Sequence, residues 1–211
     1  MRATLFDHGA GNLHSLAKAL ECAGARVSIE SEPARALDTD LLILPGVGAF
    51  SAAAHALAPA RESVRAALEG GLPCLGVCLG MQLLFDESDE GPGSGLGLIR
   101  GRVTRIRARR VPHIGWNTIE EQDDALFDRA PLPIAYFANG FACRPSDEAS
   151  VIAWCAHEGD RFPAAVRRGL ALGVQFHPEK SSRLGLAFLS AFVDEVRAAT
   201  RSTSRESRPC S

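Results

Sequence analysis

The sequence predicts an α/β domain with a mostly parallel central sheet, flanking helices and an antiparallel or mixed extension. Apolar strand-like runs alternate with helical patterns through the first half of the chain, and such repeated units imply a parallel sheet covered on both faces. From about residue 98 to residue 174 the pattern changes to short alternating segments punctuated by glycine and proline, which indicates antiparallel or mixed pairing. The 211 residues, 46% of them hydrophobic, are enough for one compact domain with a sizeable core.

The elements follow from hydrophobic periodicity, which has a repeat of two residues in strands and 3.6 in helices. In the first half we expect strands at 3–6, 26–30, 41–44 and 72–77, and helices at 13–23, 61–68 and 79–85. The second half adds short strands, 103–106 and 134–137 among them, and an amphipathic helix at about 183–199. A single domain at 1–199 is therefore expected, with a polar, aperiodic and disordered tail at 200–211.

Charge and hydropathy exclude several classes of function. The net charge of −2 gives no general attraction to nucleic acid or to an anionic membrane. No apolar run reaches membrane-spanning length, and the first residues lack the apolar core of a signal peptide, so a cytoplasmic location is expected. The six cysteines are scattered without Cys-x-x-Cys pairs, which favours reduced thiols and predicts no metal site and no cofactor.

A candidate nucleophile lies in the motif Gly-Val-Cys-Leu-Gly at residues 76–80. An apolar strand precedes Cys78 and a helical pattern follows it, so the cysteine is expected on a sharp strand-to-helix turn. The flanking glycines allow that turn without a Cβ clash. At a helix N-terminus the dipole and free N–H groups favour thiolate over thiol. Cys78 alone could be a small buried thiol, but the distant His-Pro-Glu described next favours catalysis.

A candidate base and its orienting carboxylate lie in His-Pro-Glu at residues 177–179. Pro178 biases the preceding residue towards extended backbone, in which residues two apart point the same way. Glu179 could therefore bind one imidazole nitrogen of His177 while the other faces Cys78. That arrangement is the logic of a nucleophilic triad.

Acyl transfer also needs donors for a tetrahedral oxyanion. The N–H of Leu79, the residue after the nucleophile, is one candidate. The second is expected from Val47 or Gly48, in a glycine-flanked loop that follows an apolar strand, although an ordinary turn would explain that loop equally well. Gln82 lies one helical turn beyond Cys78 and could bind a polar substrate head or simply face solvent.

Six arginines fall between Arg100 and Arg110. Their interleaving with Val103 and Ile106 favours solvated edge strands, where positive charge discourages edge-to-edge pairing. Binding of phosphate or of an acidic partner is the less favoured alternative.

The motifs Cys-Leu-Gly-Met-Gln at 78–82 and Gln-Phe-His-Pro-Glu at 175–179 resemble those of the class I, triad-type glutamine amidotransferases. Further stretches are similar to the glutaminase subunits of imidazole glycerol phosphate synthases. These stretches are Asp-His-Gly-Ala-Gly-Asn-Leu-His-Ser at 7–15, Leu-Pro-Gly-Val-Gly-Ala-Phe at 44–50, Pro-His-Ile-Gly-Trp-Asn at 112–117 and residues 173–181. They occur in order from residue 5 to about residue 190.

The resemblance implies the class I glutamine amidotransferase fold and an activity. L-glutamine would be hydrolysed to glutamate and ammonia through a Cys78 thioester, with His177 as general base and then acid and Glu179 orienting it. Ammonia would pass to a cyclase subunit, a (β/α)₈ barrel bound as a heterodimer. The cyclase would make imidazole glycerol phosphate and aminoimidazole carboxamide ribotide in histidine biosynthesis. A glycine-flanked Val47 amide would suit activation by the loaded partner.

The resemblance also implies contact residues. Asn139 and Gly140 would contact substrate, while Asn12, Trp116 and Lys180 would face the partner or the ammonia tunnel. Helix capping, core packing and simple solvation are the respective alternatives for these last three residues. The chain departs from the family at 7–9, where Asp-His-Gly replaces Asp-Tyr-Gly, and at 136–141, where Tyr-Phe-Ala-Asn-Gly-Phe replaces Tyr-Phe-x-His-Ser-Tyr.

Two other functions stay open on the sequence alone. The same glutaminase could serve a surface-sugar amidotransferase, because fold and triad do not fix the acceptor. A non-catalytic redox or regulatory protein with Cys78 as sensor is the more distant alternative, since an exposed thiolate would suit that too.

Overall fold

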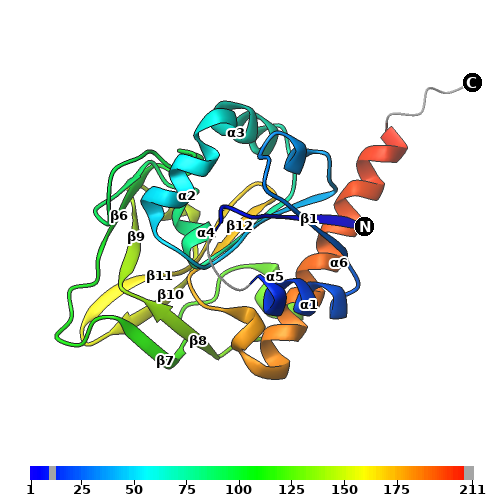
Figure 1. Ribbon diagram of the computed structural model, residues 1–211. Coiled ribbons are helices and arrows are strands. Elements are labelled where there is room, and N and C mark those ends of the chain that lie inside the picture. The colour runs from blue at the N-terminus through cyan, green and yellow to red at the C-terminus, as the bar shows by residue number, and fades with distance from the viewer. Residues whose placement is uncertain (10–12, 207–211) are drawn as a thin grey trace, which may run out of the picture.

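A seven-stranded sheet forms the centre of the molecule (Figure 1). The computed structural model describes residues 1–9 and 13–206, except for the side chains of 202–206. The strand order is β10-β11-β12-β4-β3-β1-β2. The last five strands run parallel to one another, and β11 pairs antiparallel with both β10 and β12. The strands are β1 (Arg2–Phe6), β2 (Arg26–Glu30), β3 (Leu41–Leu44), β4 (Cys74–Val77), β10 (Val151–His157), β11 (Asp160–Arg168) and β12 (Ala171–Val174). The predicted α/β class with a mostly parallel sheet is confirmed.

Alternation along the buried strands divides the core into two layers. Leu41 and Ile43 pack into one layer, whereas Leu42 and Leu44 pack into the other, as expected for side chains that point to opposite faces. The first layer is covered by α1 (His14–Cys22), α5 (Ala125–Arg129) and α6 (Ser182–Glu206). The second is covered by α2 (Phe50–Leu57), α3 (Arg61–Glu69) and α4 (Leu79–Gln82), and Figure 1 shows α2 and α3 on the side of the sheet away from α1 and α6. Short 3₁₀ turns are η1 (Arg35–Leu37), η2 (Ala58–Ala60), η3 (Glu148–Ser150) and η4 (Pro178–Lys180).

The extension consists of two small sheets beside the β10–β11 edge. One contains β5 (Glu87–Ser88), β6 (Gly101–Arg105) and β9 (Phe141–Pro145), and the other is the antiparallel pair β7 (His113–Thr118) and β8 (Ile134–Asn139). The expectation that the arginine run forms edge strands is wrong for β6, which lies between β5 and β9. Arg102 of β6 pairs with both Glu87 and Asp89, so the charge of this side chain lies within local ion pairs.

Four helices differ from the sequence expectation. Helices α2 and α5 were not expected at all. Helix α4 stops at Gln82 rather than at residue 85, because the Leu84 and Phe85 amides donate to the Met81 and Gln82 carbonyls three residues earlier instead of four. Helix α6 continues to Glu206, past the expected boundary at residue 199, and the Thr200 hydroxyl donates to the carbonyls of Val196 and Arg197. Residues 207–211 of the expected disordered tail lie outside the described residues.

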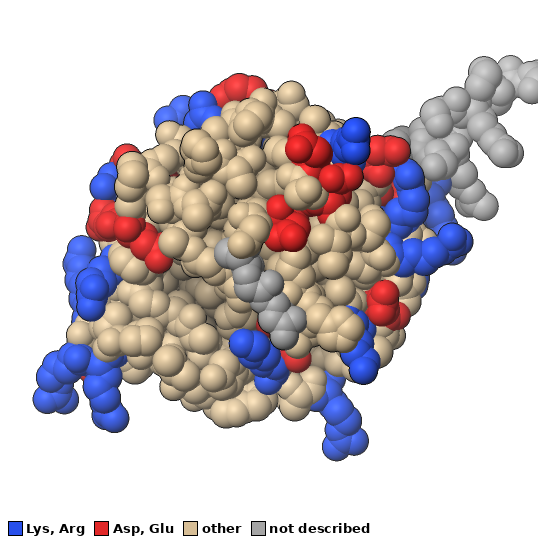
Figure 2. All heavy atoms as spheres, viewed as in Figure 1, with Lys and Arg blue, Asp and Glu red and all other residues tan. Residues whose placement is uncertain are grey.

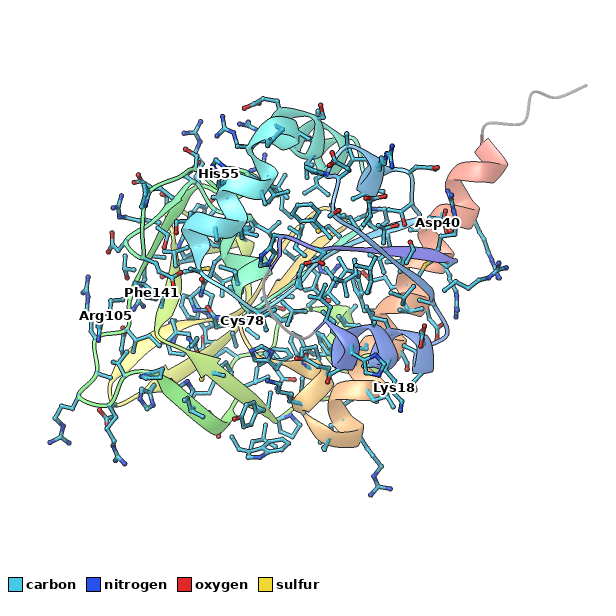
Figure 3. The ribbon with its side chains drawn as sticks, in the orientation of Figure 1. Lys18, Asp40, His55, Cys78, Arg105 and Phe141 are labelled. Carbon is cyan, nitrogen blue, oxygen red and sulfur yellow. The ribbon has the colours of Figure 1, made fainter. Side chains whose placement is uncertain are left out.

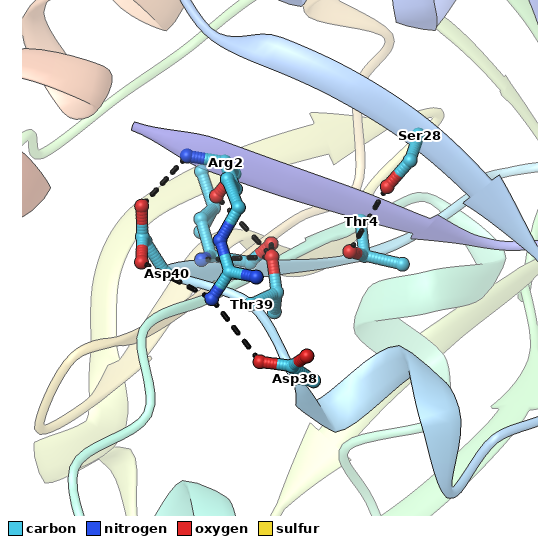
Figure 4. A network of polar contacts seen from close by, with 7 residues as sticks. Arg2, Thr4, Ser28, Asp38, Thr39 and Asp40 are labelled. Atoms are coloured by element: carbon cyan, nitrogen blue, oxygen red, sulfur yellow. Dashed lines mark hydrogen bonds and ion pairs between the residues drawn. The ribbon is translucent and has the colours of Figure 1, made fainter.

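Polar contacts fix β1 at its amino end (Figure 4). The Arg2 amide donates to the Asp40 carboxylate at 2.7 Å, and its guanidinium lies 3.1 Å from Asp38. The hydroxyls of Thr4 and Ser28 meet at 3.3 Å between β1 and β2. The Arg2 contacts lie at the strand end opposite the carboxyl edge, and the Thr4–Ser28 contact lies in the middle of both strands.

None of the helices in the described part of the chain combines the length and apolar character needed to span a bilayer.

Candidate active site

The candidate nucleophile and base lie together at the carboxyl edge of the central sheet. Strands β4 and β12 are parallel neighbours in register, with Val77 opposite Val174, so the segments that follow both strands emerge side by side. The Cys78 amide donates to the Val174 carbonyl at 2.7 Å, which ties the turn after β4 to the segment that carries His177. Figure 3 shows Cys78 near the middle of the molecule, between the helices above and the small sheets below.

Cys78 occupies the sharp turn that the sequence predicts. Its backbone has φ 47° and ψ −102°, an uncommon conformation for a residue with a side chain. A Cβ added to Gly76 would lie 2.5 Å from the Gly80 carbonyl oxygen, and one added to Gly80 would lie 2.0 Å from that of Leu44. Both glycines are therefore required by close backbone approach around the nucleophile.

His177 is a buried imidazole bound to its orienting carboxylate. Its Nδ1 lies 2.8 Å from Glu179 Oε1, and both side chains are almost completely buried. Burial lowers the pKa of His177, but hydrogen bonding and charge from Cys78 and Glu179 outweigh burial and raise it to about 9. An imidazolium beside the cysteine is thus favoured at neutral pH, as a thiolate nucleophile requires.

The backbone around His177 is clamped to strand β8. The His177 amide donates to the Tyr136 carbonyl at 2.8 Å. The fully buried Ser181 hydroxyl donates to the His177 carbonyl at 2.7 Å and accepts the Tyr136 amide at 3.0 Å. One hydroxyl therefore fixes the base relative to the neighbouring hairpin.

A cavity of about 210 Å³ opens beside Cys78. Gly48 and Leu79, two of the three expected oxyanion donors, line it, whereas Val47 is not among the lining residues and packs partly against the core. Gly46 also lines the cavity, and a Cβ there would lie 3.1 Å from both Cys78 Cβ and His177 Cε1. Because residue 46 is glycine, the backbone of the loop after β3 can lie directly against Cys78 and His177.

The three expected substrate residues line the same cavity, although their amides also bind protein groups. Gln82 Nε2 donates to the Phe141 carbonyl at 3.2 Å, so Gln82 is a buried residue and not a solvent-exposed one. Asn139 Nδ2 donates to the same carbonyl at 3.0 Å. Gly140 contributes only backbone to the wall, which suits recognition through main-chain groups.

Sequence reasoning missed Glu90, whose carboxylate is the acidic group in the cavity wall. Glu90 Oε2 accepts the Phe50 amide at 2.9 Å, so it caps α2 directly after the oxyanion loop. Nothing in the local sequence marks this residue, since its partner lies 40 positions earlier in the chain. The one feature that could have indicated Glu90 is its place as an acidic residue in the loop region after the nucleophile turn.

The expected partner residues have different outcomes. Trp116 is 51% exposed, so it is not a core aromatic, and its ring meets Tyr136 edge-on at 6.2 Å. The Lys180 ammonium lies 5.9 Å from the centre of the Tyr136 ring. Asn12 lies outside the described residues. Two of the three residues therefore meet at one exposed aromatic cluster formed by Trp116, Tyr136 and Lys180.

The fold and this site define a class of protein. A sharp-turn cysteine, a histidine–glutamate pair that follows the neighbouring strand and backbone-lined space beside them form the arrangement expected of a cysteine triad for acyl transfer. The class-I glutamine amidotransferase family profile matches residues 4–196, and the chain belongs to that family.

Curated relatives carry a more specific description than the family does. The chain is 41% identical over 204 residues to "Imidazole glycerol phosphate synthase subunit HisH" of Synechococcus sp. (strain JA-3-3Ab), covering 93% of this chain and 94% of that one. It is 45% identical over 197 residues to a protein of the same description from Thermus thermophilus, covering 90% and 96%.

Solved structures confirm the fold. PurLQS from Thermotoga maritima matches with a TM-score of 0.72 at 20% identity, over 92% of this chain and 98% of that chain. The glutaminase domain of Trypanosoma brucei CTPS matches with a TM-score of 0.59 at 17% identity, over 94% and 93%.

Proposed function

We propose that this chain is the glutaminase subunit of an imidazole glycerol phosphate synthase. It hydrolyses L-glutamine to glutamate and ammonia and supplies the ammonia to a cyclase subunit, which forms imidazole glycerol phosphate and aminoimidazole carboxamide ribotide in histidine biosynthesis. The HisH relatives, about 40–45% identical over most of the chain, support the assignment of the subunit. The observation that carries the chemistry is the buried His177–Glu179 pair beside the sharp-turn Cys78.

The first half-reaction forms a thioester. The Cys78 thiolate attacks the side-chain carboxamide carbon of glutamine, and the C=O electrons move to oxygen. Backbone N–H groups at Leu79 and in the Val47–Gly48 loop bind this oxyanion, and each such donor contributes roughly 3–4 kcal/mol to the transition state. The His177 imidazolium then protonates the departing nitrogen, so that ammonia leaves and a glutamyl thioester remains.

The second half-reaction hydrolyses that thioester. Neutral His177 removes a proton from water, the resulting hydroxide adds to the thioester carbon, and collapse of the oxyanion expels the Cys78 thiolate as glutamate forms. Glu179 holds the imidazole in one orientation and stabilises its charged form throughout. The Glu90 carboxylate suits the substrate ammonium, and the polar groups of Gln82, Asn139 and Gly140 suit the remainder of an amino acid. A cavity of about 210 Å³ is smaller than the pockets of about 300 Å³ or more that hold drug-sized ligands, as an amino-acid substrate requires.

The exposed aromatic cluster supports a heterodimer with the cyclase barrel. Trp116 and Lys180 contribute to a surface that is not covered within the described part of the chain, and Trp is enriched at binding hot spots. A cytoplasmic site of action is part of the proposal, because the nucleophilic thiol must stay reduced and the five described cysteines are all free. The proposal invokes no cofactor.

Ammonia release from L-glutamine tests the proposal. The purified chain should show strong activation by the cyclase subunit with its nucleotide ligand bound, and Cys78→Ala should abolish release under all conditions. Release that persists in Cys78→Ala would overturn the nucleophile. Silence with the cyclase but activity with a sugar amidotransferase would change the acceptor and keep the glutaminase.

A further inference from the structure

Gln175 lies against the nucleophile and has no role in the triad. Its side chain is completely buried, and its Nε2 lies 3.4 Å from Cys78 Sγ. Its Oε1 accepts a hydrogen bond from Gln82 Nε2 at 3.3 Å. A polar chain therefore runs from the cavity wall through two glutamines to the sulfur.

The direction of this chain is fixed by a backbone carbonyl. The Phe141 carbonyl can only accept, so the Gln82 group that faces it at 3.2 Å must be the NH₂. The same NH₂ donates its second hydrogen to Gln175, which must present its oxygen there. The NH₂ of Gln175 is then left facing the sulfur, so the Phe141 carbonyl determines the orientation of both amides.

We propose that Gln175 is a positioning residue that donates an N–H to the Cys78 thiolate and thereby stabilises and aims it. Cys78 also raises the pKa of His177 through hydrogen bonding and charge, so the base interacts with the same sulfur, and hydrogen bonds to a charged acceptor favour the charged form. Because Gln82 lines the cavity and holds the oxygen of Gln175, the substrate wall and the nucleophile share one rigid network. This inference rests on the proposed role of Cys78 as nucleophile.

Alkylation of Cys78 by iodoacetamide, followed on the Cys78 peptide by mass spectrometry across the pH range, tests the inference without substrate or partner. Gln175→Met removes the donor and should slow alkylation near neutral pH by roughly tenfold or more, with the pH profile displaced to the alkaline side. Gln175→Glu retains the shape and an acceptor for Gln82 but places an oxygen beside the sulfur, and it should slow alkylation as well. With the cyclase present, kcat for glutamine should fall while KM changes little.

Gln122→Met is the matched control. Gln122 also donates through Nε2 to two carbonyls, those of Ile119 and Leu132, but it is not among the residues that line the cavity. It should lower the melting temperature much as Gln175→Met does and leave alkylation unchanged. If either Gln175 variant folds and Cys78 is alkylated at wild-type rates at every pH, the positioning role is wrong. If Cys78→Ala still hydrolyses glutamine, the proposed nucleophile fails instead, which keeps the two failures distinct.

Discussion

At the scale of single residues, His177 should set the alkaline limit of activity. Its pKa is raised above the ordinary 6.5 to about 9, so the stabilisation it receives from its partners is complete below about pH 6.5 and is lost as pH rises through about 9. Because departing ammonia takes its proton from this imidazolium, kcat/KM for glutamine should fall above about pH 9. The imidazole resonances of His177 in NMR spectra should titrate over the same range.

Glu179→Gln provides the comparison for that titration. Glu179 raises the pKa of His177 by hydrogen bonding and by charge, so the variant should move both the NMR midpoint and the alkaline limit of activity to lower pH. The interaction with Cys78 remains in the variant, so the pKa of His177 should not lose the whole of its upward shift. An unchanged midpoint in the variant would mean that Glu179 does not act on the base electrostatically.

Gly46→Ala should inactivate the enzyme without unfolding it. The added Cβ would lie 2.9 Å from the Val77 carbonyl oxygen and 3.1 Å from His177 Cε1, so the loop or the base must shift. Since a misplacement of about 1 Å can cost roughly 10²-fold in rate, kcat/KM should fall by about that factor. Gly70→Ala at the end of α3, which has an ordinary φ of −75°, should leave activity unchanged, and equal activity in the two variants would contradict the close approach.

The candidate catalytic residues could be found in the sequence because the features that mark them are local. Cys78 lies between two glycines at the end of an apolar run, and His177 and Glu179 are two positions apart. Glu90, Gln175 and Ser181 escaped prediction because their roles depend on partners 40, 97 and 45 positions away. A single sequence contains no signal for such pairs until the fold brings them together.

At the scale of elements, Ser181 joins the 3₁₀ turn η4 to strand β8, and Ser181→Ala should loosen that joint. The Tyr136 amide would lose its acceptor in a buried place, which costs about 1–3 kcal/mol of the free energy of unfolding. The His177 carbonyl would lose one of its two donors and keep the Lys180 amide, so kcat should decrease as the base is held less firmly. Urea denaturation and steady-state kinetics measure the two effects.

Ser190→Ala is the control for this substitution. Its hydroxyl donates to the Leu186 carbonyl within α6, which is a local helix contact, and removal should change stability by no more than about 0.5 kcal/mol. Equal losses of unfolding free energy in the two serine variants would show that the Ser181 hydrogen bonds stabilise the protein no more than a local helix contact does.

The helix errors have identifiable physical causes. Helix α2 buries Phe50, Ala53, Ala54 and Leu57, a helical spacing that small alanines make hard to recognise. Helix α4 is shorter than expected because its hydrogen bonds change from four-residue to three-residue spacing after Leu83, and the loop at 96–99 then binds the carbonyls of Leu83, Leu84 and Phe85, which prevents further helix. Periodicity therefore predicted most elements of the parallel sheet but not where tertiary contacts end or extend a helix.

At the scale of the whole molecule, the exposed apolar side chains lie at opposite ends of the fold. Ile114 and Trp116 are 64% and 51% exposed on β7, beside the cavity-lining strand β8. Ile29 is 55% exposed on β2, the strand at the far edge of the central sheet. Outside the grey atoms, Figure 2 shows an area without charged side chains to the left of and below the middle of the viewed face, while acidic side chains gather above and to the right of the middle.

A matched pair of substitutions distinguishes a partner surface from a generally exposed apolar residue. Ile114→Ser should weaken association with the cyclase subunit, and Trp116→Ala should weaken it further, by about 2 kcal/mol or more if the indole is a hot spot. Ile29→Ser removes a similar exposed side chain from the opposite edge and should leave the dissociation constant unchanged. Titration calorimetry with the cyclase, together with ammonia release at saturating partner, measures both affinity and activation. Equal affinities for all three variants and the wild type would place the partner elsewhere on the molecule and leave the exposed aromatic cluster without a function. Weaker binding by the Ile114 and Trp116 variants alone would locate the docking face beside the cavity proposed to release ammonia.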